Sequence, residues 1–375
     1  MCIFTKKASF NLSSKKMLSV IVFTICLLIS LSAYAEVPVI KNMGFQYIAA
    51  NNVLRTWYDL SYSGVGSVNI SLEASEDGGK NFNIIPTQVS GDFGLVFPGT
   101  NKKANWNIGS ECPWLDPQTV IMRIVASDAD HTIRYITVGG TMMVLVPGGS
   151  NDMGSVDTPP DGMPIFGDEL PEHTVTIDSF YMDVSEVTNA KYAEFMSATG
   201  YPAPIYWADP RFNAPTQPVV GLKWEDAVAF CNWAGKRLPT EAEWERACRG
   251  GHDGRDFPWG NVLDYNYGNF ASVKDADIWY DTAPVCSFKP NDYGLFDMIG
   301  NVYEWCSDYY EYGYYANSPV NNPMGPPTGE TRVLRGGSCY DGFFPSYLRC
   351  ATRYSYFGAT MDGLIGLRCA MSIPQ

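Results

Sequence analysis

Residues able to do chemistry are few and scattered in this chain of 375 residues. Its three histidines, His131, His173 and His252, lie far apart, and none stands in a metal-ligand spacing such as H-x-x-x-H. That pattern disfavours a zinc protease, a three-histidine iron site and a Ser-His-Asp hydrolase. The segment Asp297–Glu304 instead offers carboxylate and carbonyl oxygens, which hard cations such as Ca²⁺ prefer. Sulfur chemistry is the other possibility, because the chain has 10 cysteines.

Residues 1–35 have the features of a secretory signal peptide: a basic start, an apolar run over Leu18–Ser32, and the small-x-small site Ala33-Tyr34-Ala35. The apolar run is short for a transmembrane helix, so we expect no membrane span after cleavage. We therefore predict export to the periplasm or the extracellular space. Cleavage removes Cys2 and Cys26, and in an oxidising compartment the remaining cysteines are expected to form disulfides.

The charge balance excludes one class of partner. Cleavage removes four lysines and leaves 22 basic against 40 acidic residues. Nucleic-acid binding requires a basic stripe, and the sequence has none.

Two regions follow the signal peptide. Residues 36–138 have short alternating patterns, over Val68–Ala74, Val120–Ala126 and Ile133–Val138, and a further short strand is expected around Phe82–Ile85. These patterns predict an all-β sandwich of the immunoglobulin or fibronectin kind, which we interpret as a spacer or docking module. Gly139-Gly140 marks the expected domain boundary.

The second predicted domain, 141–375, has few helices. We expect one over Asn189–Ala198 after the cap Thr188, one over Trp224–Ala234, and one opened by the capping box Thr240–Glu243 and ending near Gly250. Beyond Gly250 the chain is mostly loops rich in glycine, proline and aromatic residues. A stretch that long without periodicity needs cross-links or metal ions to hold it.

This second region resembles the formylglycine-generating-enzyme (sulfatase-modifying-factor) family along nearly its whole length. The matching segments occur in family order: VPGGSNDMGS (146–155), PEHTVTIDSFYMDVSEVTNAKYAEF (171–195), PVVGLKWEDAVAFCNWAGKRLPTEAEWERACRGG (218–251), FPWGN (257–261), APVCSFKPNDYGLFDMIGNVYEW (283–305), RVLRGGS (332–338) and GLRCA (366–370). The resemblance implies an α+β, C-type-lectin-like fold with little regular structure.

The resemblance also implies cross-links. Cys231 would pair with Cys369, and Cys248 with Cys350. One structural Ca²⁺ would be bound by the side chains of Asp297 and Glu304 and the carbonyls of Gly300 and Val302. A second would use Asn269, the Phe270 carbonyl, Asp277 and the Trp279 carbonyl, where the match is weaker.

The family's enzymes oxidise a cysteine of an unfolded sulfatase segment to formylglycine, with O₂ and one copper ion held by two thiolates. Their pattern places the two cysteines three and eight residues after Gly-Gly-Ser. Here Gly336-Gly337-Ser338 is followed by Asp341 and Ser346 at those positions, and hard oxygen ligands do not hold Cu(I). Copper is therefore not expected. Cys339 and Cys306 are the nearby thiols; we expect them to lie close together, as a third disulfide or packed thiols.

The segments that line the family's substrate groove are rich in aromatic rings here. Ligand contacts are expected from Tyr340, Phe343, Phe344, Tyr347, Arg349 and Arg353. Such rings stack on extended peptides or on sugars. Two interpretations follow: a non-oxidising module that binds a polypeptide or a glycan, or a copper- or iron-dependent oxidase acting on protein cysteine. Ser338, Cys339, Asp341, Ser346 and Cys306 are the candidate residues of such an enzyme.

Overall fold

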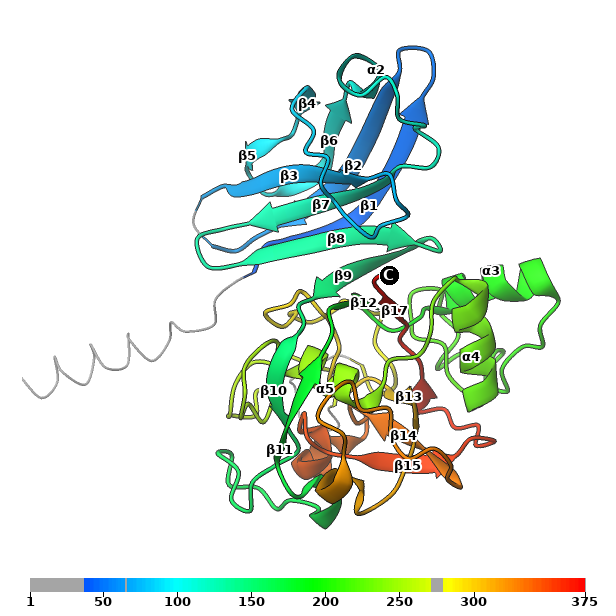
Figure 1. Ribbon diagram of the computed structural model, residues 1–375. Coiled ribbons are helices and arrows are strands. Elements are labelled where there is room, and N and C mark those ends of the chain that lie inside the picture. The colour runs from blue at the N-terminus through cyan, green and yellow to red at the C-terminus, as the bar shows by residue number, and fades with distance from the viewer. Residues whose placement is uncertain (1–36, 65, 271–278, 375) are drawn as a thin grey trace, which may run out of the picture. The chain divides into compact units, whose positions relative to one another are not determined.

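The computed structural model describes residues 37–64, 66–270 and 279–374 (Figure 1). The predicted signal peptide and Asp277 lie outside these residues. None of the helices in the described ranges combines the length and the hydrophobicity that a membrane span requires.

Residues 37–138 are almost entirely β. The elements are β1 (Val39–Ile48), β2 (Val53–Ser61), β3 (Val68–Ser75), β4 (Val89–Gly91), β5 (Gly94–Val96), β6 (Gly99–Trp106), the short helix α2 (Ile108–Glu111), β7 (Ile121–Ser127) and β8 (Thr132–Val138). The strands form where apolar residues alternate along the sequence, because every second side chain of a strand points to the same face. In β3, Val68, Ile70 and Leu72 are all buried. The prediction of a strand around Phe82–Ile85 is wrong, because Ile84 forms an isolated β-bridge with Ala74 instead of a strand.

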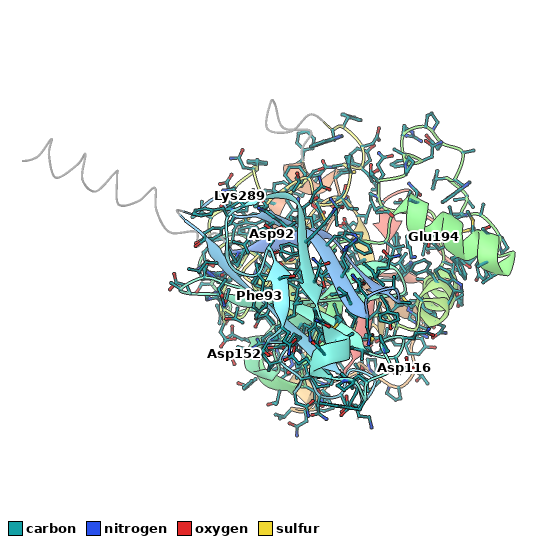
Figure 2. All side chains as sticks on the ribbon, turned by 90° about the horizontal axis from the view of Figure 1, so that it is seen from above. Asp92, Phe93, Asp116, Asp152, Glu194 and Lys289 are labelled. Atoms are coloured by element: carbon teal, nitrogen blue, oxygen red, sulfur yellow. The ribbon has the colours of Figure 1, made fainter. Side chains whose placement is uncertain are left out.

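These strands belong to two sheets. One has the order β1-β2-β6-β4, and β3, β5, β7 and β8 belong to the other. The chain crosses between them at Asp92 and Phe93, both labelled in Figure 2, which connect β4 to β5. The Tyr58 hydroxyl donates to the Asp92 carbonyl at 2.6 Å and fixes this crossing.

Gly139 and Gly140, the expected domain boundary, form a hairpin turn. Both have positive φ, 57° and 76°, and β8 pairs directly with β9 (Thr141–Val146) across them. Two consecutive positive φ values are what a tight two-residue hairpin requires. The sheet therefore continues, in the order β17-β12-β9-β8-β7-β3-β5, from one predicted domain into the other. A separate sandwich over 36–138 stays a prediction.

The C-terminal region is loop-rich α+β. Its elements after β9 are β10 (Gly149–Met153), η1 (Gly167–Glu169), β11 (His173–Ile177), β12 (Phe180–Asp183), α3 (Asn189–Thr199), α4 (Trp224–Trp233), α5 (Glu241–Arg249), β13 (Tyr303–Tyr309), η2 (Tyr314–Asn317), β14 (Thr331–Arg335), η3 (Asp341–Phe343), η4 (Pro345–Leu348), β15 (Tyr354–Phe357), β16 (Ile365–Gly366) and β17 (Ala370–Ser372). The three predicted helices are confirmed. Thr188 and Thr240 cap α3 and α5, and left-handed Gly200 and Gly250 end them.

Buried ion pairs take the place of regular structure in this region. Arg335 is fully buried between α5 and the segment after η4; it pairs with Glu245 and donates to the carbonyls of Cys350, Ala351 and Thr352. Burial alone would raise the pKa of Glu245, but Arg249 and Arg335 hold it below its usual value. The guanidinium groups thus supply hydrogen-bond donors to loop carbonyls that no helix or sheet satisfies.

Candidate functional site

The candidate site is built at the end of the hairpin formed by β13 and β14. Glu304 and Arg335 are paired residues of these strands, and β15 pairs with the other side of β14. Gly336 and Gly337 follow β14 with φ of 96° and 72°, and turn the chain into η3. A Cβ at Gly337 would lie 2.9 Å from the Leu348 side chain, so glycine is what lets η4 approach.

Asp341 is the residue that the resemblance puts at the first copper position, and its carboxylate is already hydrogen-bonded. Its Oδ2 accepts from the backbone N–H and from the hydroxyl of Ser338, both at 2.7 Å. Tyr303 also bonds to this carboxylate, and burial together with the Asp341 charge raises the pKa of Tyr303. Asp341 therefore ties the glycine turn to η3.

Ser346, which the resemblance puts at the second copper position, is half-buried. Its carbonyl accepts from the Thr352 hydroxyl at 2.6 Å. A carboxylate already hydrogen-bonded by Ser338 and a serine hydroxyl are hard oxygen donors, so the residues here do not fit a Cu(I) site.

The two nearby thiols are both buried, Cys306 on β13 and Cys339 in the turn after β14. Burial, together with the carboxylates of Asp308 and Glu241, raises the pKa of the Cys306 thiol. A reactive or metal-binding cysteine needs the opposite, a lowered pKa that favours the thiolate. The proximity of Cys306 and Cys339 stays a prediction.

Aromatic rings gather beside this turn. We call the following set the aromatic surface: Phe166, Phe343, Phe344, Tyr347, Tyr354 and Tyr356. Tyr347 lies at its centre, with ring centroids 5.1 Å from Phe166, 6.3 Å from Phe344 and 6.2 Å from Tyr354. Phe343 and Phe344 are 62% and 64% exposed, far more than packing requires. Phe166 comes from a distant loop and was missed by the sequence analysis, since nothing in its local pattern predicts this contact.

Tyr340 extends the aromatic rings toward a different loop. Its hydroxyl donates to Asp281, and its ring packs edge-on against Tyr280 at 5.8 Å. Tyr280 itself is 72% exposed.

Arg349 and Arg353, two of the expected ligand contacts, are buried in ion pairs. Arg349 binds Glu169 at 2.8 Å and Arg353 binds Glu241 at 2.8 Å. Tyr315 covers the Arg353 guanidinium at 4.2 Å. The structure therefore corrects their role: both hold the core together and neither faces a ligand.

The first expected Ca²⁺ site brings Asp297 and Glu304 into a buried acidic group with Glu186. Glu304 is engaged by both of its oxygens, with Arg368 Nε at 2.9 Å and Trp244 Nε1 at 2.7 Å. Asp297 Oδ2 accepts from the Cys286 backbone N–H at 2.7 Å, and burial raises its pKa. Glu304 pairs with Arg368, while Glu186 Oε2 is buried and has no hydrogen-bond partner within the described ranges, so one carboxylate oxygen of this group is available to a cation.

The second expected site also offers an unpaired oxygen. Asn269 Oδ1 is buried and has no hydrogen-bond partner within the described ranges, while Asn269 Nδ2 donates to the Asp281 carbonyl at 2.8 Å. An unpaired buried amide oxygen is a suitable Ca²⁺ ligand. Calcium stays a prediction at both sites.

The predicted cysteine pairs lie together. The sulfur atoms of Cys231 and Cys369 are 3.0 Å apart, and those of Cys248 and Cys350 are 2.8 Å apart. Both pairs are buried, and each joins a helix to the C-terminal loops, as the resemblance implies.

Comparisons with known proteins agree with this architecture. The family model described as "Sulfatase-modifying factor enzyme 1-like domain" matches residues 136–373. The formylglycine-generating enzyme of Streptomyces coelicolor is 39% identical over 60% of this chain and 88% of that protein. A bovine (Bos taurus) protein named inactive C-alpha-formylglycine-generating enzyme 2 is 32% identical over 63% of this chain and 91% of its own length. The solved structure of PvdO from Pseudomonas aeruginosa superposes with a TM-score of 0.55 at 28% identity, covering 62% of this chain and 95% of that one.

Proposed function

Because the chain belongs to the family of sulfatase-modifying factor enzyme 1-like domains, we propose that it is an exported, non-oxidising member that binds a polypeptide or a glycan. The bound segment lies along the aromatic surface, and the family scaffold serves to present it.

One observation carries the non-oxidising part of this proposal. At the position that needs a copper thiolate, Asp341 accepts two hydrogen bonds from Ser338. A side chain fixed in this way organises a turn, and it offers Cu(I) neither a soft ligand nor an open one. The name of the bovine relative includes the word "inactive", which is consistent with a family that has members without the oxidase activity.

The aromatic surface supports the binding part. Exposed Phe343 and Phe344 lie beside half-buried Tyr347, so a ligand would meet several ring faces at once. Rings of this kind give large contact area at small entropic cost.

A second candidate function is an oxidase of the formylglycine-generating type, dependent on copper or iron and acting on protein cysteine. The 39% identity to the Streptomyces coelicolor enzyme favours it. It would have to act without the two thiolates, which is why we place it second.

The binding proposal is tested with two probes, a displayed library of random 12-residue peptides and a glycan array. We expect ligands from one of the two, and we expect the double variant Phe343→Ala, Phe344→Ala to weaken their binding by about tenfold or more, since each stacked ring contributes on the order of 1 kcal/mol. Phe97→Ala is the matched control, because Phe97 is 68% exposed on the connection after β5 and does not belong to the aromatic surface, and it should leave binding unchanged. Selection of no ligand from either probe, or equal binding by the double variant, would contradict the proposal.

A further inference from the structure

The C-terminal strand β17 is an edge of the seven-stranded sheet, beside β12 (Figure 1). Its hydrogen-bonding direction follows from its neighbours. Asp183 N–H donates to the Cys369 carbonyl at 2.9 Å, so in an antiparallel pair Met371 also faces β12, while Ala370 and Ser372 face away. Arg237 confirms this alternation, because it exchanges both backbone hydrogen bonds with Ala370, at 2.9 and 2.7 Å.

Ser372 has no such neighbour. The residue that would continue the pairing from Arg237 is Gly235, two positions earlier, but Gly235 has a φ of 72° and its N–H donates to the Asn232 carbonyl at the end of α4. The chain thus turns away from β17 at this point. The outward N–H and C=O of exposed Ser372 have no backbone partner in the part of the chain that the structure describes.

A cavity of about 520 Å³ opens beside these two groups. Ser372 and Ile373 form one side, and Val228 of α4, Leu238 and Phe180 give it an apolar floor. Its lining shares no residue with the aromatic surface, so it is a different part of the molecule.

The charges at the rim of this cavity favour a basic residue in the ligand. Glu243 is neutralised by Arg237 through two hydrogen bonds, at 2.7 and 2.6 Å. Among the described residues, the carboxylate of exposed Asp178 has a hydrogen bond from the neutral amide of Asn322 and no basic partner. The rim therefore keeps a net negative charge beside an apolar cavity.

We propose that β17 and this cavity bind an extended segment of another polypeptide by strand addition. One residue of the segment exchanges backbone hydrogen bonds with Ser372, an apolar side chain enters the cavity, and a neighbouring lysine or arginine pairs with Asp178. Edge strands with unpaired backbone groups are templates for this mode of recognition, in which the backbone gives affinity and the cavity gives specificity.

Ser372→Pro tests the backbone step selectively. Because the Ser372 N–H points away from β12, proline at this position removes the outward donor and no hydrogen bond of the sheet. Ser372→Ala is the matched control: it keeps the N–H and loses only the hydroxyl that accepts from Arg237 Nε at 3.0 Å. Val228→Trp is a second variant that fills the cavity from α4 and leaves the strand intact.

The probe is the displayed library of random 12-residue peptides, selected on the Phe343→Ala, Phe344→Ala double variant so that only this second site is sampled. We expect enriched peptides to carry an apolar residue next to a basic one, to bind Ser372→Pro and Val228→Trp at least tenfold more weakly, and to bind Ser372→Ala within about twofold. Unchanged circular dichroism of each variant shows that it folds. No enrichment on the double variant, or equal binding to Ser372→Pro and Val228→Trp, would overturn the inference.

Discussion

Replacing Arg335 with alanine is expected to lower the free energy of unfolding by about 3–5 kcal/mol, the cost typical of breaking a buried ion pair. Arg335 is fully buried; it pairs with Glu245 and donates to three loop carbonyls at 2.7 to 2.9 Å. Alanine leaves those carbonyls without donors and opens a cavity next to Trp244. Urea denaturation followed by tryptophan fluorescence measures the loss.

Arg211→Ala is the matched control for this prediction. Arg211 also pairs with a carboxylate, Asp209, at 2.7 Å, but its side chain is 55% exposed. Its removal should hardly move the denaturation midpoint. If Arg335→Ala lowered the free energy of unfolding as little as Arg211→Ala, the buried ion pairs would not be what stabilises the loops.

We expect both cysteine pairs to form disulfide bonds that stabilise the fold. Peptide mapping of protein purified under oxidising conditions should find Cys231 linked to Cys369 and Cys248 linked to Cys350. Their partners lie 138 and 102 residues apart, so removing the second bridge with Cys248→Ser and Cys350→Ser should cost about 4 kcal/mol in the free energy of unfolding.

Cys112→Ser is the control for the mapping, since Cys112 lies outside both pairs and its replacement should leave the linked peptides unchanged. Free thiols at all four positions, or a different pairing, would contradict this assignment.

The helices and the cysteine pairs were predictable because their signals are local or are carried by the family resemblance. The N-caps are Thr188 and Thr240, and the left-handed C-terminal residues are Gly200 and Gly250, as their types and positions indicated. The hairpin at Gly139-Gly140 was not predictable in the same way. A glycine pair marks a chain reversal, and only tertiary pairing shows whether the reversal separates two domains or joins two strands of one sheet.

The candidate site was predictable in its residues and less so in their roles. Phe343 and Phe344 are exposed beside the turn, as expected for ligand contacts. Arg349 and Arg353 are not, because loops deficient in regular hydrogen bonds draw guanidinium groups inward toward Glu169 and Glu241. Tyr303, which bonds to Asp341, was missed although it lies within the quoted segment 283–305.

Copper stoichiometry together with oxygen consumption decides whether this protein is an oxidase. The purified protein is reduced, supplied with Cu(I), freed of unbound metal and mixed with a cysteine-containing peptide, with a formylglycine-generating enzyme run in parallel. With oxygen-donating Asp341 and Ser346 where two thiolates would be required, we predict no stoichiometric Cu(I) and oxygen uptake no faster than without peptide. One bound Cu(I) per chain, with conversion of the peptide cysteine, would show that the scaffold is still an oxidase.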